Sequence, residues 1–381
     1  MLFRSRRKRT KRLNAMSKFF DPELSGLKPY KPGEQPRQGE KLTKLNTNEN
    51  PYDPSPKVIE AVSSRGIRAL RRYPDPDTGE LLQAVAEYYG ISEDNVIAGN
   101  GSDDILAFSY MAFQKENKKI YYPEISYGFY PVYAQLFKLD GRTIPMGKGL
   151  TIDIEKYKYL DGTVIIANPN APTGTALRRC HIEEIVKSNP GNVVIIDEAY
   201  VDFGGETSVP LINSYDNLLI IQTLSKSRSL AGGRVGYAIG SGELIEDLGT
   251  VKYSFNPYGL DSISIAAATA AIKDREYFEM TRGRIMKTRD ETSEKLKELG
   301  FEVLPSEANF IFVKHAAMPG EMYFKALRQN SIIVRHFDRP QIKDYVRITI
   351  GTDNEMHRLV EVTERIIEKS CDGAVKNNRD L

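Results

Sequence analysis

Five short apolar runs, separated by segments long enough to form helices, constrain most strongly what this chain can fold into. These runs span residues 95–98, 119–122, 164–167, 193–196 and 218–222. Runs of this length that end at glycines or polar residues are typical of strands buried on both faces. Their alternation with helical segments predicts an α/β fold with a mostly parallel sheet flanked by helices. A chain of 381 residues can bury such a sheet and still form a second, smaller domain.

Composition and pattern divide the chain into five segments. We predict a basic disordered extension at 1–16, an irregular N-terminal arm at 17–45, a large domain at 46–262, a small C-terminal domain at 263–370 and a frayed tail at 371–381. The arm is rich in proline, glycine and lysine. The small domain is expected to be α+β, because a helix-rich stretch precedes strand-like runs at 300–304, 309–313, 332–334 and 345–350, and a helix around 355–369 follows them.

Charge and cysteine usage exclude several classes of protein. Lysine and arginine fill seven of the first twelve positions; without those seven, 46 basic side chains face 51 acidic ones, a net charge of −5. A mildly acidic body argues against nucleic-acid binding, and no apolar run is long enough to span a membrane. The basic extension could still be an arm for nucleic acid or a membrane surface, but composition favours a disordered segment with Met16 as an alternative start. The two cysteines form no C-x-x-C pair, which argues against a disulfide framework or a metal site and indicates the cytoplasm.

Four polar clusters follow the apolar runs, where open α/β sheets bind their ligands. They span residues 99–104, 168–174, 197–200 and 223–227. In the first cluster, glycines and free amides at a helix start favour a bound phosphate. The same residues could also form a plain turn in which Ser102 or Asp103 caps the helix. In the second cluster, two prolines hold Asn170 where its amide could donate to a ligand oxygen.

The other two clusters carry groups of opposite charge. Asp197 ends a buried strand, so its carboxylate needs a cationic partner such as a protonated pyridine nitrogen. Lys226 also follows a strand, and burial in a pocket would make its amine nucleophilic. Arg234, after two glycines, offers a guanidinium suited to phosphate. A lysine for covalent attachment, an acid for a ring nitrogen and a phosphate cradle are together what pyridoxal 5'-phosphate requires.

The order of these motifs resembles the class I/II aminotransferase family of fold-type I pyridoxal-phosphate enzymes. The carrying motifs are Asn-Pro-Asn-x-Pro-Thr-Gly, Asp-Glu-Ala-Tyr and Ser-Lys with an arginine eight residues after the lysine. The resemblance covers about 26–351, and within the family it is strongest to the histidinol-phosphate aminotransferases. It implies the fold-type I architecture, a large cofactor-binding domain and a smaller α+β C-terminal domain. Two departures are Gly233, where the subfamily often has leucine, and Ala171, where it often has asparagine.

The resemblance implies a role at the cofactor for each matching residue. Lys226 would link covalently to the cofactor and later move the substrate proton, and Asp197 would keep the pyridine nitrogen protonated. Tyr200 and Asn170 would hydrogen-bond the phenolic ring oxygen, and Tyr127 would stack on the ring. The phosphate would be held by five residues: Gly101, Ser102, Asp103, Ser225 and Arg234.

Further roles concern the substrate and a second subunit. Tyr73 resembles a tyrosine that reaches the phosphate in the neighbouring subunit, which implies a homodimer with shared active sites. Arg347 resembles the arginine that grips the substrate carboxylate, and Arg335 a second anion-binding arginine, although both could instead be surface or structural residues. Tyr30 would touch the substrate phosphate, and Asn170 would also face the substrate.

The resemblance implies a two-step transamination in histidine biosynthesis. L-Glutamate would leave as 2-oxoglutarate, and imidazole-acetol phosphate would become L-histidinol phosphate, so the partners are small amino-acid and keto substrates. An aminotransferase for aromatic or other amino acids and a phosphothreonine-type decarboxylase remain open, because they share every cofactor residue named above. A cofactor-binding regulatory module is disfavoured, because the residues before Asn46 are too few for a DNA-binding domain.

Overall fold

The computed structural model describes residues 17, 19–37, 39–114 and 119–377, so the predicted basic extension at 1–16 lies outside the described residues. The strands are β1 Thr43–Lys44, β2 Val96–Asn100, β3 Lys119–Pro123, β4 Asp140–Ile144, β5 Thr163–Ala167, β6 Val194–Asp197, β7 Leu218–Thr223, β8 Val235–Gly240, β9 Phe301–Val303, β10 Phe310–His315, β11 Ile332–Ile333, β12 Arg335–His336 and β13 Val346–Thr349. The α-helices are α1 Pro56–Arg65, α2 Gly79–Tyr89, α3 Ser102–Ala112, α4 Tyr130–Leu136, α5 Arg179–Ser188, α6 Gly242–Phe255, α7 Ser262–Lys273, α8 Arg275–Glu298, α9 Gly320–Gln329 and α10 Asp353–Asn377. Short 3-10 helices lie at Pro22–Leu24, Ile67–Arg71, Glu93–Asn95, Lys148–Leu150, Ile154–Tyr157, Val201–Phe203 and Val209–Asn213.

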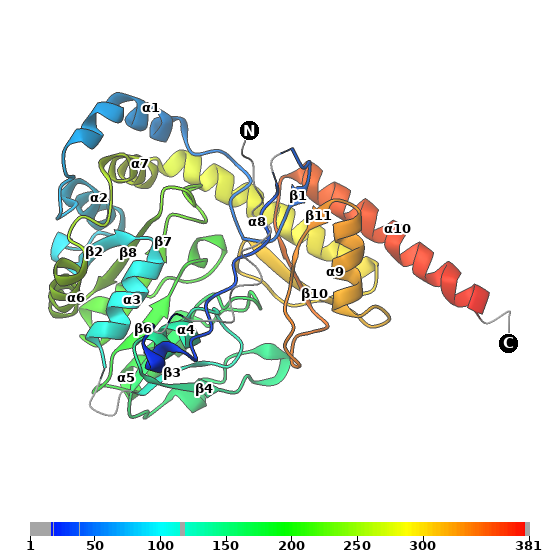
Figure 1. Ribbon diagram of the computed structural model, residues 1–381, viewed down its shortest axis with the longest axis horizontal. Helices are drawn as coiled ribbons and strands as arrows, with labels where there is room; N and C mark the ends of the chain where they lie inside the picture. Colours follow the sequence, from blue (N-terminus) through cyan, green and yellow to red (C-terminus); the bar gives the residue numbers. More distant parts are fainter. Residues whose placement is uncertain (1–16, 18, 38, 115–118, 378–381) are drawn as a thin grey trace.

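A seven-stranded sheet in the order β2-β8-β7-β6-β5-β3-β4 forms the centre of the large domain (Figure 1). Strand β8 runs antiparallel to both of its neighbours, and the other neighbouring strands pair in parallel. Helices α2, α5 and α7 pack on one face and α3, α4 and α6 on the other. Ile166 points to the first of these layers and Ile165 to the second, which explains why the strands read as continuous apolar runs. The predicted fold class, a mostly parallel sheet flanked by helices, is confirmed.

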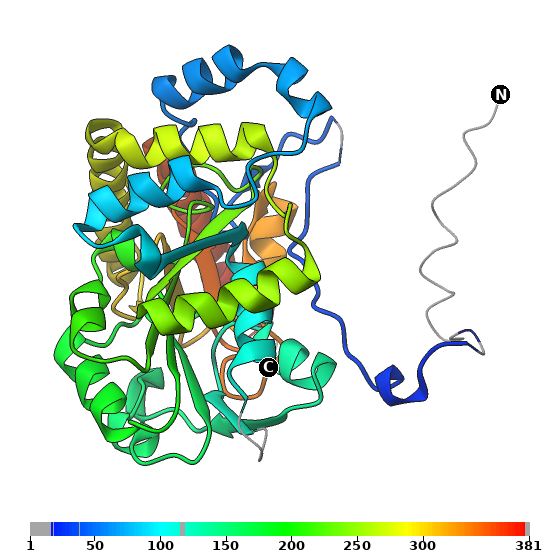
Figure 2. The same cartoon turned by 90° about the vertical axis from the view of Figure 1, so that its left-hand side faces the viewer.

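The C-terminal part of the chain forms a second, smaller sheet, which is four-stranded and antiparallel in the order β12-β13-β10-β9 and is called the small sheet below. Helices α8, α9 and α10 bury apolar side chains against it, among them Ile285, Tyr323 and Leu359. The end of the N-terminal arm joins this region, because β1 pairs in parallel with β11. Strands β1 and β11 form a separate two-stranded sheet, and Figure 2 shows the arm running along the outside of the molecule before β1.

Three features differ from the sequence-based expectation. Strand β4 has the polar sequence Asp-Gly-Arg-Thr-Ile at the edge of the sheet, and strand β8 carries two glycines, so neither resembles a buried apolar run. Gly236 in β8 is needed because a Cβ there would lie 2.3 Å from the amide nitrogen of Ser102. Helix α10 continues to Asn377, past residue 371 where the sequence predicted the tail to begin.

Two kinds of feature are absent from the described residues. In that part of the chain no helix has both the length and the apolar character to cross a membrane. The same residues contain no group of three or more His, Cys, Asp or Glu side chains that could hold a metal ion.

Candidate active site

The carboxyl ends of the central parallel strands bring three of the polar clusters to one edge of the sheet. Asp197 at the end of β6 pairs in register with Ala167 on one side and Ile221 on the other. The loop that starts at Asn168 and the turn that contains Lys226 therefore lie on either side of Asp197. Parallel strands leave the sheet at the same edge, which is why clusters from separate parts of the sequence meet here.

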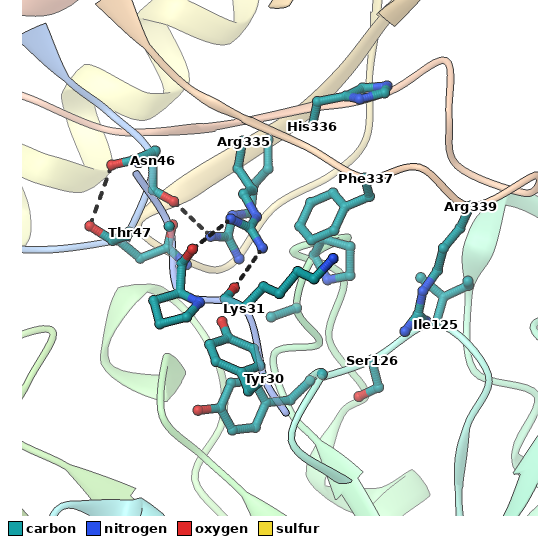
Figure 3. A pocket seen from close by; sticks show the side chains of 18 of the residues that line it. Tyr30, Lys31, Asn46, Thr47, Ile125, Ser126, Arg335, His336, Phe337 and Arg339 are labelled. Carbon is teal, nitrogen blue, oxygen red and sulfur yellow. Dashed lines mark hydrogen bonds between the residues drawn. The ribbon is translucent and has the colours of Figure 1, made fainter. Parts of the chain in front are cut away.

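A cavity of about 630 Å³ opens at this edge, between the large sheet, the small sheet and the N-terminal arm (Figure 3). Its lining includes six of the predicted site residues: Tyr30, Tyr127, Tyr200, Lys226, Arg335 and Arg347. The arm contributes residues 28–33, and Figure 3 shows Tyr30 and Lys31 beside Arg335. Six lysine or arginine side chains line the cavity, and among the described lining residues Asp338 supplies the sole carboxylate. The cavity thus favours anionic ligands.

Lys226 is half-buried in this lining. Its Nζ lies 3.4 Å from the carbonyl oxygen of Thr47 and 5.8 Å from the ring centre of Tyr200. The neighbouring Ser227 is buried, and its carbonyl oxygen accepts a 3.1 Å hydrogen bond from Asn50. The backbone next to Lys226 is therefore anchored, while its amine lines the cavity and is held only by the long contacts with Thr47 and Tyr200.

Asp197 is almost fully buried, with 4% of its surface exposed. One carboxylate oxygen accepts a 2.8 Å hydrogen bond from the hydroxyl of Tyr130, and the other accepts one from the amide of Ala199. Burial raises the pKa of Asp197 to about 6, although both hydrogen bonds oppose the rise. A carboxyl group with this pKa is stabilised in its charged form when a cation binds beside it.

The neighbouring Glu198 is a second buried carboxylate. It accepts hydrogen bonds from the hydroxyl of Thr207, the amide of Ser208 and the side chain of Gln222. Burial nonetheless raises the pKa of Glu198 to about 7. These contacts tie the loop that contains Tyr200 back onto strand β7, so Glu198 is part of the support of the site and does not line the cavity.

The residues predicted to hold a phosphate form a connected cradle at the start of α3. Arg234 donates to the carboxylate of Asp103 at 3.1 Å and to the hydroxyl of Ser225 at 3.4 Å. Tyr127 donates to the other oxygen of Asp103 at 2.9 Å. No side chain caps the first turn of α3, which leaves the amides that follow Gly101 free for an anion. Gly101 has a φ of +80°, and a Cβ there would lie 2.5 Å from Nη2 of Arg234.

Asn170 is fully buried, and its side-chain amide is already engaged. Its nitrogen donates to the carbonyl oxygen of Ile125 at 2.9 Å and to the hydroxyl of Thr173 at 3.0 Å. Its oxygen accepts from Ser126 at 2.8 Å. A hydrogen bond from Asn170 to a ligand oxygen therefore requires the exchange of one of these partners.

The two predicted substrate arginines line the cavity from the small domain. Arg347 donates from Nη2 to the carbonyl oxygen of Asn46 at 3.0 Å, while its buried Nε has no partner. Burial lowers the pKa of Arg347, as expected for a cation that awaits an anionic partner. Arg335 donates to the arm carbonyls of Lys31 at 3.1 Å and Pro32 at 3.5 Å.

Of two further predicted site tyrosines, one lines the cavity and the other is exposed away from it. Tyr30 on the arm stacks on Phe129 with ring centres 4.5 Å apart, which brings it over the cavity. Tyr73 is 80% exposed and stacks on Tyr258, so the structure does not bring it to the other predicted residues of the same chain.

Several residues that support the site were not predicted from the sequence. The segment 46–50 contacts three predicted site residues, because Asn46, Thr47 and Asn48 meet Arg347, Lys226 and Tyr200 in turn. Asn50 holds Ser227, next to Lys226. Tyr130 on α4 meets Asp197, and Arg339 lines the cavity wall next to Ile125 and Ser126. The dense asparagines before Pro51 were the one available signal for the first group; nothing in the local sequence of Tyr130 or Arg339 marks them.

Comparison with known proteins defines the class. The family model for Aminotransferase class I and II matches residues 40–362, and the chain belongs to this family. The chain is 49% identical to a histidinol-phosphate aminotransferase of Clostridium acetobutylicum over 352 residues, 92% of this chain and 100% of that protein. It is 50% identical to one of Acinetobacter baylyi over 357 residues, 93% of this chain and 99% of that protein. The solved histidinol-phosphate aminotransferase of Sinorhizobium meliloti, in complex with pyridoxal-5'-phosphate, superposes with a TM-score of 0.82 at 23% identity; 93% of this chain and 99% of that chain are covered, and this likeness concerns the fold alone.

Proposed function

We propose that the chain transfers an amino group between L-glutamate and imidazole-acetol phosphate, with 2-oxoglutarate and L-histidinol phosphate as the products. Curated relatives with nearly half of their residues identical over more than nine-tenths of the chain are histidinol-phosphate aminotransferases. The structural observation that best supports this proposal is the cavity, which has Lys226 on one side and Arg335 and Arg347 on another. A cavity rich in cations suits substrates that carry a carboxylate, such as glutamate, or a phosphate ester.

The residues present fit pyridoxal phosphate. The uncapped start of α3 with Arg234 and Ser225 matches a phosphate group, and the buried carboxylate of Asp197 matches a protonated ring nitrogen. A side chain at Gly101 would fill this cradle. When bound, the cofactor supplies a carbonyl that links to amines and a ring that withdraws electrons from the substrate α-carbon.

Each residue around the cofactor would then have its own role. Lys226 would hold the cofactor through its amine and would move the proton at the substrate α-carbon. Asp197 keeps a positive charge on the ring nitrogen, and Tyr200 donates to the phenolic ring oxygen. Tyr127 packs against the ring face. Asn170 shares the ring oxygen with Tyr200, provided that one of its present partners is exchanged.

The substrate would be oriented by the arginines and the arm. Arg347 grips the carboxylate through its Nε and the remaining donors of its guanidinium group. Arg335 and Tyr30 face the substrate phosphate. Because the arm covers the cavity, it also excludes water from the reacting groups.

We further propose that the protein acts as a homodimer in the cytoplasm. Tyr73 is strongly exposed, and Arg234 in the cradle keeps 45% of its side chain exposed. A second copy of the chain could therefore place its Tyr73 beside the phosphate. Sedimentation of the purified protein should give a mass of two chains.

A half-reaction screen tests the proposed reaction. The cofactor-loaded protein is mixed separately with L-glutamate, L-histidinol phosphate, aromatic amino acids and phosphothreonine, and the cofactor absorbance is followed. Histidinol phosphate and glutamate should convert the spectrum fastest and give the corresponding keto products. Release of carbon dioxide from phosphothreonine would instead indicate a decarboxylase, and a faster reaction with aromatic amino acids an aminotransferase of another specificity.

A further inference from the structure

Asn48 lies in a part of the site that the proposed reaction leaves without a role. The residue is 1% exposed, and its backbone adopts a φ of +57°, which asparagine tolerates better than most residues. The side-chain amide nitrogen of Asn48 donates a 2.9 Å hydrogen bond to the hydroxyl oxygen of Tyr200. An amide nitrogen can only donate, so the oxygen of Tyr200 must accept, and the hydroxyl hydrogen must point elsewhere.

The orientation of the Asn48 amide is itself held by neighbours from the small domain. Its oxygen accepts a 3.0 Å hydrogen bond from the hydroxyl of Thr349, which in turn accepts one from the Asn48 backbone amide. Asn309 donates to the Asn48 carbonyl oxygen at 2.9 Å. Because Thr349 ends the strand that carries Arg347, the direction of hydrogen bonding runs from the small sheet through Asn48 to Tyr200.

We propose that Asn48 is a positioning residue that sets the direction of the Tyr200 hydroxyl, so that Tyr200 donates its hydrogen into the cavity toward the cofactor ring oxygen. The inference rests on the proposed function, because it takes Lys226 as the residue that holds the cofactor. Tyr200 lies beside that lysine, with 5.8 Å between Nζ and the ring centre, so its hydroxyl is within reach of the same ligand.

A hydrogen bond from Tyr200 would change how the linked cofactor holds its proton. A donor at the negatively charged ring oxygen draws charge away from the neighbouring nitrogen of the covalent link. That nitrogen then loses its proton more easily, and the pKa of the linked cofactor falls. If Tyr200 turned its hydrogen toward residue 48 instead, the ring oxygen would lose its donor and the pKa would rise.

The test is an absorbance titration of the cofactor-loaded protein in which residue 48 is made an acceptor. Asn48→Asp keeps the shape of the side chain but replaces the donor with a carboxylate, to which Tyr200 would donate. The pKa of the cofactor absorbance should rise by about one unit, in the same direction as in Tyr200→Phe. The other charged groups around this pair, Lys226, Arg347, Asp197 and Glu49, stay unchanged in both variants.

The double variant Asn48→Asp with Tyr200→Phe distinguishes an effect of the Tyr200 hydrogen-bond direction from an effect of the added negative charge. If Asn48 acts through Tyr200, the double variant should titrate like Tyr200→Phe alone. A further rise in the double variant would mean that the new carboxylate acts directly on the cofactor, and this result, or an unchanged pKa in Asn48→Asp, would overturn the proposal.

Thr349→Val is a second route to the same answer if Asn48→Asp does not fold. It removes the contact that holds the Asn48 oxygen and adds no charge, so the Asn48 amide can turn over. A smaller rise in the same direction is expected, and no rise contradicts the inference. Borohydride reduction of the wild type tests Lys226 separately. A label on another residue would overturn both the proposed function and this inference, whereas a label on Lys226 with an unchanged titration in the variants overturns the inference alone.

Discussion

The hydroxyl of Tyr130 donates a 2.8 Å hydrogen bond to a carboxylate oxygen of Asp197, and both side chains are buried. A hydrogen bond to the charged form of an acid lowers its pKa, so this contact opposes the burial that raises the pKa of Asp197 to about 6. Tyr130→Phe should therefore raise that pKa further and weaken cofactor binding at pH 7 by roughly 10-fold. Cofactor titration of the apoprotein between pH 5 and about 9 measures the effect.

Tyr110 provides the matched control for Tyr130. It is also buried, but its hydroxyl has no hydrogen-bond partner among the described atoms. Tyr110→Phe removes the same group from a neighbouring position without a contact to Asp197, so cofactor affinity should stay at the wild-type value. Equal losses in the two variants would show that the Tyr130 contact is not responsible.

Asp197→Asn should change how the stability of the apoprotein depends on pH. The pKa of Asp197 is about 6 in the fold and 3.8 in its reference state, so the folded chain binds the proton more tightly. Stability from this group is fully present below about pH 4 and is lost as the pH rises through about 6, a change of roughly 3 kcal/mol. The variant should lose that dependence and be more stable than wild type at pH 8, as followed by urea unfolding. Its turnover should nonetheless fall by at least about 100-fold, because the ring nitrogen loses its anionic partner.

Lys226→Ala should abolish turnover. Among the described lysines that line the cavity, Lys226 alone directly follows the strand next to Asp197. Reduction of the loaded wild type with borohydride, followed by peptide mass analysis, should place the cofactor on Lys226. The variant should still bind the cofactor through the cradle but should carry no covalent label. Turnover near the wild-type rate would contradict the assignment of Lys226.

Arg347→Gln and Arg335→Gln should differ in which half-reaction they impair. Arg347 is proposed to grip the carboxylate of glutamate and, in the other half-reaction, the phosphate-bearing end of histidinol phosphate, which takes the place of a carboxylate. Its loss should therefore raise KM for both substrates by about 10- to 100-fold. Arg335 faces the arm, and its loss should raise KM chiefly for the phosphate substrate. Arg328→Gln is the control for arm anchoring, because Arg328 pairs with Glu34 on the arm and does not line the cavity. If Arg328→Gln reproduced the Arg335→Gln pattern, the effect would come from loosening of the arm.

Much of the fold could be predicted because burial on both faces leaves a direct mark in the sequence. Strands β5, β6 and β7 differ from the predicted runs by no more than one residue at each end, since each is an unbroken apolar run. The edge strand β4 and the glycine-containing β8 carry no such mark. The positions of these two strands depend on their neighbours. In β8, for example, Gly236 leaves room for the start of α3 to approach the sheet.

The sequence by itself determined which chemical groups stand at the strand ends, because a polar residue directly after a buried strand must emerge at the edge of the sheet. Asp197 and Lys226 were identifiable for that reason. Only the tertiary structure decided what surrounds them. Asn48 meets Thr349 across 301 positions and Tyr200 across 152, and Tyr130 meets Asp197 across 67. Contacts of that range leave no local periodicity, since they arise from how the segment 46–50, the small sheet and helix α4 pack around the cavity.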